Sequence, residues 1–357
     1  MTVPAILAIA VPGCSALNPD FQPQDGATAS SGSASTTGTD ADVDEQPTAG
    51  LDTSSGGDSP LGTAGSTGEG SIATSTTDAD VTGTGDCACA LIEPCPDDVG
   101  GPPHTALGVD CADVPVQVSV YAAPGALGVM GQLGTTAAFL PTEGSLSLVM
   151  GTGDVSRLDD AGADCTQGEP FGRQYDFPIL PAPLIAVDAG GDCLRRPQLA
   201  GFGDCSNTIE EQFTGGAFDY TDVWLTTTVP DGADAVAVDY AFLTAEYPDY
   251  IDPDWNDMFV VWLESEQWTG NIALDGQGNA IAIDSVQLDY MDDDSDLAVF
   301  EGTCMVGHGA TGWNTGSGPV VAGEEITVVL ALWDGGDPGL DAYALVDGLR
   351  WECGACL

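Results

Sequence analysis

The chain has 357 residues, of which 43% are hydrophobic, and this is enough to bury a sizeable core, so we do not expect disorder over its whole length. It carries 56 aspartates and glutamates against five arginines and no lysine, for a formal net charge of -51. A field of this sign repels nucleic-acid backbones and anionic lipid headgroups and concentrates cations. It argues against a nucleic-acid partner and makes divalent-metal binding a working hypothesis, although a general acidic bias for solubility explains the charge equally well.

The first 14 residues are predicted to be an export signal. The apolar run Val3–Val11 is followed by Pro12, Gly13 and Cys14, an order that resembles the lipobox of bacterial lipoproteins. We expect Cys14 to be acylated after the signal is removed, so that the protein reaches a membrane only through a lipid anchor. Pro12 and the lack of a basic residue before the run depart from this pattern, and a true start upstream of Met1 would explain the second departure. A short N-terminus with an incidental cysteine is the alternative.

Ten further cysteines form an even set, which suits up to five disulfides in an oxidising compartment. They are Cys87, Cys89, Cys95, Cys111, Cys165, Cys193, Cys205, Cys304, Cys353 and Cys356. We expect local pairing among the first four and pairing of Cys304 with the C-terminal two. Zinc half-sites at Cys87–Cys89 and Cys353–Cys356 are the alternative. The protein is therefore expected to be exported, as an outer-membrane or cell-surface lipoprotein or otherwise as a secreted protein.

Four regions follow one another along the chain. After the signal segment 1–14, residues 15–86 consist almost entirely of Ala, Ser, Thr, Gly, Asp and Pro and cannot bury a core. They are predicted to form a flexible acidic tether, with an end-to-end distance on the order of 45 to 50 Å as a random coil. Residues 87–114 are rich in Cys and Pro and are predicted to be a stapled collar between the tether and a β domain at 115–357.

The β domain is predicted from short segments in which hydrophobic residues alternate between turns rich in Gly, Pro and Asp. Its expected strands are 116–120, 146–148, 236–242, 258–263, 281–283, 326–332 and 343–351. Residues 258–263 are apolar throughout, as in a strand covered on both faces. No segment keeps a helical period, and no apolar stretch approaches the length of about 18 residues that a transmembrane helix needs. The fold class is therefore all-β, a β-sandwich or jelly-roll-like domain after a disordered N-terminal tether.

Two acidic loops between these strands carry the candidate site. Its residues are Glu246, Asn256 and Asp257 in the first loop and Asp334, Asp337 and Asp341 in the second. Clustered carboxylates repel one another unless a cation neutralises them. Calcium accepts six to eight oxygen ligands in irregular geometry, which Asp, Asn and Glu side chains supply. We expect one calcium ion shared between the loops, with ordinary solvated turns as the alternative.

The same residues carry a family resemblance. The Ala-Glu-Tyr-Pro sequence at 245–248, the Asn-Asp-Met-Phe sequence at 256–259 and the loop 334–341 resemble the choice-of-anchor L domain, and weaker echoes lie at 148–154 and 218–225. The resemblance covers about residues 115 to 352. It implies an extracellular protein displayed at a cell surface, with a role in adhesion and no established reaction.

Groups suited to catalysis are scarce. The two histidines, His104 and His308, lie in predicted loops, and none of the common hydrolase, kinase or nucleotide-binding motifs is present. We expect a binding or adhesion module rather than an enzyme, with a glycan or a cell-surface or matrix protein as ligand. Aromatic surface for such a ligand could come from Trp255, Trp262, Trp268, Trp313 and Trp333. The alternatives are a secreted glycoside hydrolase with Glu246 and Asp257 as its carboxylate pair, and a purely structural surface-layer or matrix protein.

Overall fold

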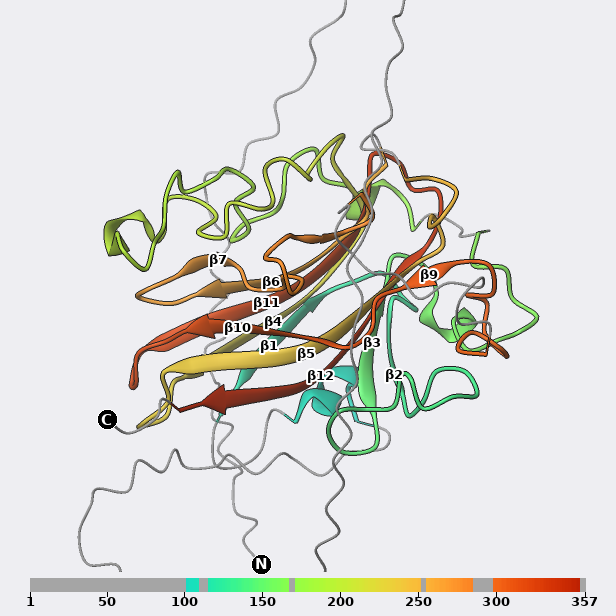
Figure 1. Cartoon of the computed structure of the whole chain (residues 1–357), viewed down its shortest axis with the longest axis horizontal. Coiled ribbons are helices and arrows are strands. Elements are labelled where there is room, and N and C mark those ends of the chain that lie inside the picture. Colours follow the sequence, from blue (N-terminus) through green and yellow to red (C-terminus); the bar gives the residue numbers. More distant parts are fainter. Residues whose placement is uncertain (1–100, 109–114, 167–170, 252–254, 285–297, 354–357) are drawn as a thin grey trace, which may run out of the picture. The chain divides into compact units, whose positions relative to one another are not determined.

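A computed structural model describes residues 101–108, 115–166, 171–251, 255–284 and 298–353, which all belong to the compact unit Ala79–Leu357. The expected signal segment with Cys14, the tether and most of the collar lie outside the described residues, as do Cys87, Cys89, Cys95, Cys111 and Cys356. Two antiparallel sheets of six strands each pack face to face (Figure 1). The predicted all-β sandwich is therefore confirmed.

The first sheet, sheet A, has the strand order β1-β4-β11-β6-β7, and β8 also pairs with β6. Its strands are β1 (Gln117–Tyr121), β4 (Ala217–Thr228), β6 (Met258–Glu264), β7 (Thr269–Asn271), β8 (Ile281–Ala282) and β11 (Glu325–Gly335). Sheet B has the order β10-β5-β12-β3-β2, and β9 also pairs with β5. Its strands are β2 (Leu127–Met130), β3 (Ser147–Gly151), β5 (Ala235–Thr244), β9 (Gly309–Ala310), β10 (Asn314–Pro319) and β12 (Ala342–Glu352).

The main hydrophobic core lies between the two sheets. It contains Val261 and Leu330 of sheet A and Phe242 and Val346 of sheet B, all fully buried. Leu107, at the end of the short 3-10 helix η1 (Pro103–Leu107), is buried in the same core. The described part of the expected collar, at Leu107, therefore packs onto the sandwich.

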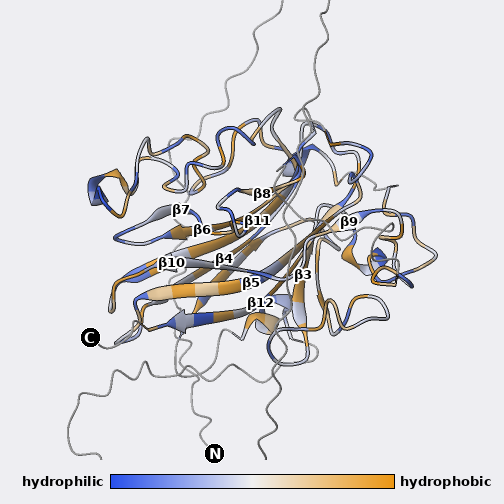
Figure 2. Cartoon of the chain, in the orientation of Figure 1, coloured by the Kyte–Doolittle hydropathy of each residue, from blue (hydrophilic) through white to orange (hydrophobic). Residues whose placement is uncertain are grey.

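Each sheet is also covered on its outer face. The segment between β3 and β4 contains the 3-10 helices η2 (Val155–Arg157), η3 (Arg173–Tyr175) and η4 (Pro197–Leu199). Its Leu180 and Ile209 are buried with Trp262 and Trp333 of sheet A. Phe300 and Met305 cover sheet B in the same way. Hydrophobic colour is strong along β5 in Figure 2, and all residues from Met258 to Leu263 of β6 are buried, as predicted for a strand covered on both faces.

Disulfides fasten these covering segments. Cys165 pairs with Cys304, with their Cα atoms 5.4 Å apart, and Cys193 pairs with Cys205 at 5.6 Å. The expected pairing of Cys304 with the C-terminal cysteines is wrong, because the loop that holds Cys304 packs beside Cys165 in the cover of sheet B. Cys353 is disulfide-bonded as well, so it is not a zinc ligand. Disulfides of this kind are typical of exported proteins.

No helix in the described ranges is long and apolar enough to cross a membrane.

Candidate functional site

The two acidic loops meet at one end of the sandwich because the strands that flank them are neighbours in the sheets. In sheet A the end of β11 pairs with the start of β6, where Trp333 lies opposite Met258. In sheet B the start of β12 pairs with the end of β5, where Ala342 lies opposite Thr244. The loop from β5 to β6 and the loop from β11 to β12 therefore both begin and end at the same end of the sandwich.

Backbone hydrogen bonds hold the two loops together. The amide of Asn256 donates to the carbonyl of Gly335 over 3.1 Å, and the amide of Ala245 donates to the carbonyl of Asp341 over 3.1 Å. The amide of Gly335 donates to Oδ1 of Asp257 over 3.2 Å. A Cβ atom at position 335 would collide with the backbone of Asn256, so this approach requires glycine.

Four of the predicted carboxylates are buried at this end of the sandwich. Glu246 is 5% exposed, Asp257 0%, Asp334 2% and Asp341 4%, whereas Asp337 is half-buried. Oε2 of Glu246, Oδ2 of Asp257 and Oδ1 of Asp334 have no hydrogen-bond partner among the described residues. Buried carboxylate oxygens without a partner are costly, so each of these three needs a proton or a cation.

The electrostatics show that these carboxylates act on one another. Burial and then the charge of Glu246 raise the pKa of Asp257 well above its usual range, and burial and then the charge of Asp257 do the same to the pKa of Asp334. Burial, together with the charge of Asp337, raises the pKa of Glu246 to about 8. Burial raises the pKa of Asp341 to about 6, although a hydrogen bond from Tyr343 opposes the shift. The structure thus brings five of the six predicted residues into one mutually repelling cluster.

Asn256, the sixth predicted residue, has its amide group engaged elsewhere. Its Nδ2 donates to the carbonyl oxygen and to Oε1 of Gln212, over 3.0 and 2.8 Å. Its Oδ1 accepts from the backbone amide of Asp284 over 3.1 Å. The side chain therefore fastens the loop to its surroundings, and the oxygen donors of the candidate site come from the carboxylates.

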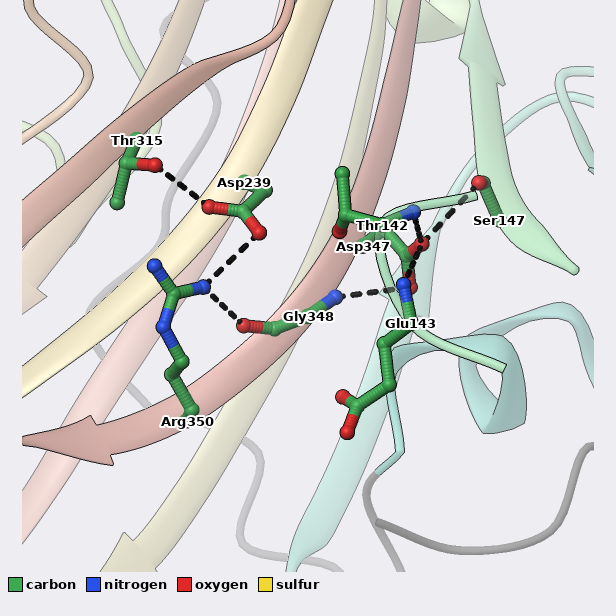
Figure 3. A network of polar contacts seen from close by, with 8 residues as sticks. All are labelled: Thr142, Glu143, Ser147, Asp239, Thr315, Asp347, Gly348 and Arg350. Atoms are coloured by element: carbon green, nitrogen blue, oxygen red, sulfur yellow. Dashed lines mark hydrogen bonds and ion pairs between the residues drawn. The ribbon is translucent and has the colours of Figure 1, made fainter. Parts of the chain in front are cut away.

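Other buried carboxylates in the chain have the partners that this cluster lacks. Asp347, 1% exposed, accepts from the amides of Thr142, Glu143 and Gly348 over 2.6, 3.0 and 2.8 Å (Figure 3). Nearby, Asp239 forms an ion pair of 3.0 Å with Arg350. Buried oxygens without a partner among the described residues also occur on Asp188 and Asp284, so the candidate site is distinguished by three such carboxylates that act on one another.

Sequence reasoning missed Asp219 as a member of the cluster. This residue is 2% exposed and adopts a positive φ of 47°, which is uncommon outside glycine. Burial raises its pKa to about 6, with further contributions from the charges of Asp176 and Asp341. The pairing of β4 with β11 is irregular beside it, between Leu332 and Asp334, and such bulges often adjoin functional sites.

The sequence did carry a signal for Asp219 and for other residues beside the cluster, in the weaker family echoes at 148–154 and 218–225. Thr152 lies beside Asp334 and opposes the rise of its pKa by burial. Gly153 leaves room for Asp341, because a Cβ atom at position 153 would overlap that carboxylate. Both weakly marked segments therefore adjoin the same cluster as the two acidic loops.

As its side chains stand, the described part of the chain contains no group of three or more His, Cys, Asp or Glu residues placed to hold a metal ion. The fit to calcium depends instead on the three unpartnered oxygens and on the chemistry of the donors. Hard, anionic oxygens in flexible loops are the ligands that calcium prefers.

The predicted tryptophans divide between core and surface. Trp262 and Trp333 are fully buried, Trp268 and Trp313 are half-buried, and Trp255 is 39% exposed. Two of the five are therefore core residues that cannot offer a surface to a ligand.

Fold and site together define a disulfide-braced β-sandwich with a buried carboxylate cluster at one end. No family model matches the chain, and no curated protein matches it. Two crystal structures of a β-glucosidase from Kluyveromyces marxianus, one selenomethionine-labelled and one with glucose, are similar to parts of it at TM-scores of 0.16 and 0.17 and 11% identity. The matches cover 36% and 39% of this chain but only 11% and 12% of the enzyme. Likeness at this level carries no argument about fold or function.

Proposed function

We propose that the chain is an exported, surface-anchored binding module that is stabilised by calcium and has no catalytic activity. The observation that carries the proposal is the group of three buried carboxylate oxygens without hydrogen-bond partners, on Glu246, Asp257 and Asp334. The strongest charges acting on Asp257 and Asp334 are those of other carboxylates, so the cluster needs a counter-charge. In the metal-free protein the raised pKa of Glu246, about 8, keeps a proton on the cluster at neutral pH, and a bound divalent cation would supply the counter-charge in place of protons.

Calcium suits the cluster better than zinc or magnesium. The donors are carboxylate oxygens from loops, and calcium tolerates irregular geometry, whereas magnesium demands a near-ideal octahedron and zinc prefers nitrogen and sulfur. Asp257, Asp334 and Glu246 would hold the ion. Asp337 and Asp341 would complete the charge around it.

Location at the cell exterior is supported by the disulfides of the sandwich and by the expected lipid attachment at Cys14. The resemblance to the choice-of-anchor L domain supports display at a surface. An acidic tether of the kind expected at 15–86 would hold the sandwich away from the membrane. The ligand would be a glycan or a cell-surface or matrix protein.

The glycoside hydrolase alternative is less well supported. A raised pKa near 8 would suit Glu246 as an acid. However, Glu246 and Asp257 are 5% and 0% exposed, which leaves little of either carboxylate for a substrate to contact. Hydrolysis of a panel of glycosides that is lost in Glu246→Gln would establish the alternative and contradict the proposal.

Calcium titration of the chelator-treated full chain by isothermal calorimetry tests the proposal. We expect one site clearly stronger than the weak binding that any protein of this charge shows, and we expect Asp257→Asn to remove it. Asp347→Asn is the matched control, because Asp347 is equally buried but has protein donors. Equal calcium binding by the wild type and Asp257→Asn would contradict the proposal.

A further inference from the structure

A second feature lies on the outer face of sheet A, beside β1 and β4. A pocket of about 340 Å³ opens there, within the size range of small-molecule sites. Its lining includes Ser119 and Tyr121 of β1 and Tyr220, Asp222 and Trp224 of β4. Neither the carboxylate cluster nor the expected aromatic surface includes these side chains.

The strand register explains the shape of the pocket. Ser119 lies opposite Trp224, and Tyr121 lies opposite Asp222. Side chains two residues apart share one face of a strand, so these four groups stand together on the outer face. Ser119 is the small member of the set and leaves space between the rings of Tyr121 and Trp224. Phe177, from the segment that covers sheet A, closes another side.

Contacts between aromatic rings fix the walls before any ligand binds. The ring centroid of Tyr121 lies 5.7 Å from that of Phe177 and 6.2 Å from that of Tyr220. The ring centroids of Phe177 and Tyr220 are 5.3 Å apart. The hydroxyl of Tyr121 also donates to the carbonyl of Gln174. Tyr121 nevertheless remains 38% exposed, so part of a firmly held ring is available to a ligand.

The pocket also offers polar groups of both kinds. Asp222, 3% exposed, accepts from the backbone amide of Tyr121 over 3.2 Å and keeps acceptor capacity on its carboxylate. The hydroxyl of Tyr220 is buried beside Asp222; burial, and then the charge of Asp222 and a hydrogen bond with it, raise the pKa of Tyr220 well above its usual range. A ligand that fits must therefore present apolar surface to the rings and hydroxyl groups that both donate and accept.

We propose that this pocket binds a pyranose ring of an extracellular glycan. A pyranose has an apolar C–H face that stacks on aromatic rings and a rim of hydroxyls that can pair with Asp222 and with Tyr220. An organic ammonium ion would satisfy the rings and the carboxylate but has no rim of hydroxyls to extend the Tyr220–Asp222 pair. The inference rests on the proposed binding function and names its ligand class.

Binding of the full chain to immobilised pyranosides, including glucosides, galactosides, mannosides and N-acetylglucosaminides, tests the inference, with a trimethylammonium surface as a second probe. We expect retention on at least one pyranoside and a loss of about tenfold or more in Tyr121→Ala, since one stacked ring accounts for about that factor. Ser119→Phe fills the pocket without removing any contact and should abolish retention. Phe202→Ala is the control, because Phe202 is 79% exposed and does not line the pocket. Melting temperatures of all variants show whether they fold.

Retention that survives both pocket variants would overturn the pocket assignment while leaving the proposed binding function in place. Retention on no pyranoside, or only on the ammonium surface, would overturn the ligand class. Repeating the measurement with Asp257→Asn separates the two proposals, because failure of the calcium site leaves the pocket contacts intact.

Discussion

Gly335 donates its backbone amide to Oδ1 of Asp257 over 3.2 Å, and Oδ2 of the same carboxylate has no hydrogen-bond partner in the described part of the chain. Asp257 is fully buried, so its ionised form is costly, and burial and then the charge of Glu246 raise its pKa well above the usual range. Asp347 shows that the chain can surround a buried carboxylate with donors elsewhere. Asp257 therefore differs from Asp347 in lacking donors, and it shares this lack with Glu246 and Asp334 at the strand ends where the acidic loops meet.

The stability of the calcium-free protein should fall as pH rises from about 4 to about 8. Burial raises the folded-state pKa of Glu246 to about 8 and those of Asp341 and Asp219 to about 6. The folded state therefore binds more protons than the unfolded state, so this stabilisation is complete below the unfolded pKa of about 4 and is lost as pH passes the folded values. Urea unfolding in EDTA at pH 5 and pH 8 measures the difference. Glu246→Gln should reduce the loss of unfolding free energy above pH 6. A wild-type unfolding free energy that stays level or rises with pH would contradict the account.

Replacing Asp204 by alanine should destabilise the sandwich by about 3 kcal/mol, whether or not calcium is present. Its carboxylate accepts from the backbone amides of Ser206, Thr208 and Asn271, each over 3.0 Å, so its loss leaves buried donors unpaired. Chemical denaturation in EDTA and in calcium provides the measurement. A cost that differs between the two conditions would mean that Asp204 belongs to the calcium response.

The two disulfides should differ in their contributions to stability. Cys165–Cys304 closes a separation of 139 residues, and Cys193–Cys205 closes one of 12. Loop-closure entropy then predicts that replacing both cysteines by serine costs about 4 to 5 kcal/mol for the first bridge and about 3 kcal/mol for the second. Denaturant unfolding of the two double variants gives the ranking, and a larger loss from Cys193→Ser with Cys205→Ser would reverse it.

Hydrophobic patterning predicted the sandwich because each of the seven expected segments places apolar side chains in the core between the sheets. It did not predict β10, whose sequence is rich in glycine because Gly318 packs closely on the side chains of Leu263 and Ile272. It also did not predict β4, where Asp219 and Asp222 interrupt the pattern with buried carboxylates. Both strands depart from the composition of ordinary strands.

The candidate site was predictable only in part. Charge and loop position selected Glu246, Asp257 and Asp334, because acidic residues at strand ends stand out in any sequence. They also selected Asn256, whose engagement with Gln212 depends on a tertiary contact that spacing does not reveal. The pairing of Cys304 with Cys165 was missed for the same reason, because only the folding of the covering segments brings these cysteines together.

Thermal unfolding of the wild type and of Asp257→Asn at pH 8, each in EDTA and in calcium, tests the central claim most directly. Without calcium, the asparagine removes a carboxylate whose ionisation is opposed by burial and by the charge of Glu246, so the variant should melt at the same temperature as the wild type or higher. With calcium, the wild type gains the binding free energy of the ion and should melt above the variant. This reversal of order is the predicted result. A wild-type melting temperature that calcium leaves unchanged, or a rise of equal size in both proteins, would contradict the calcium site.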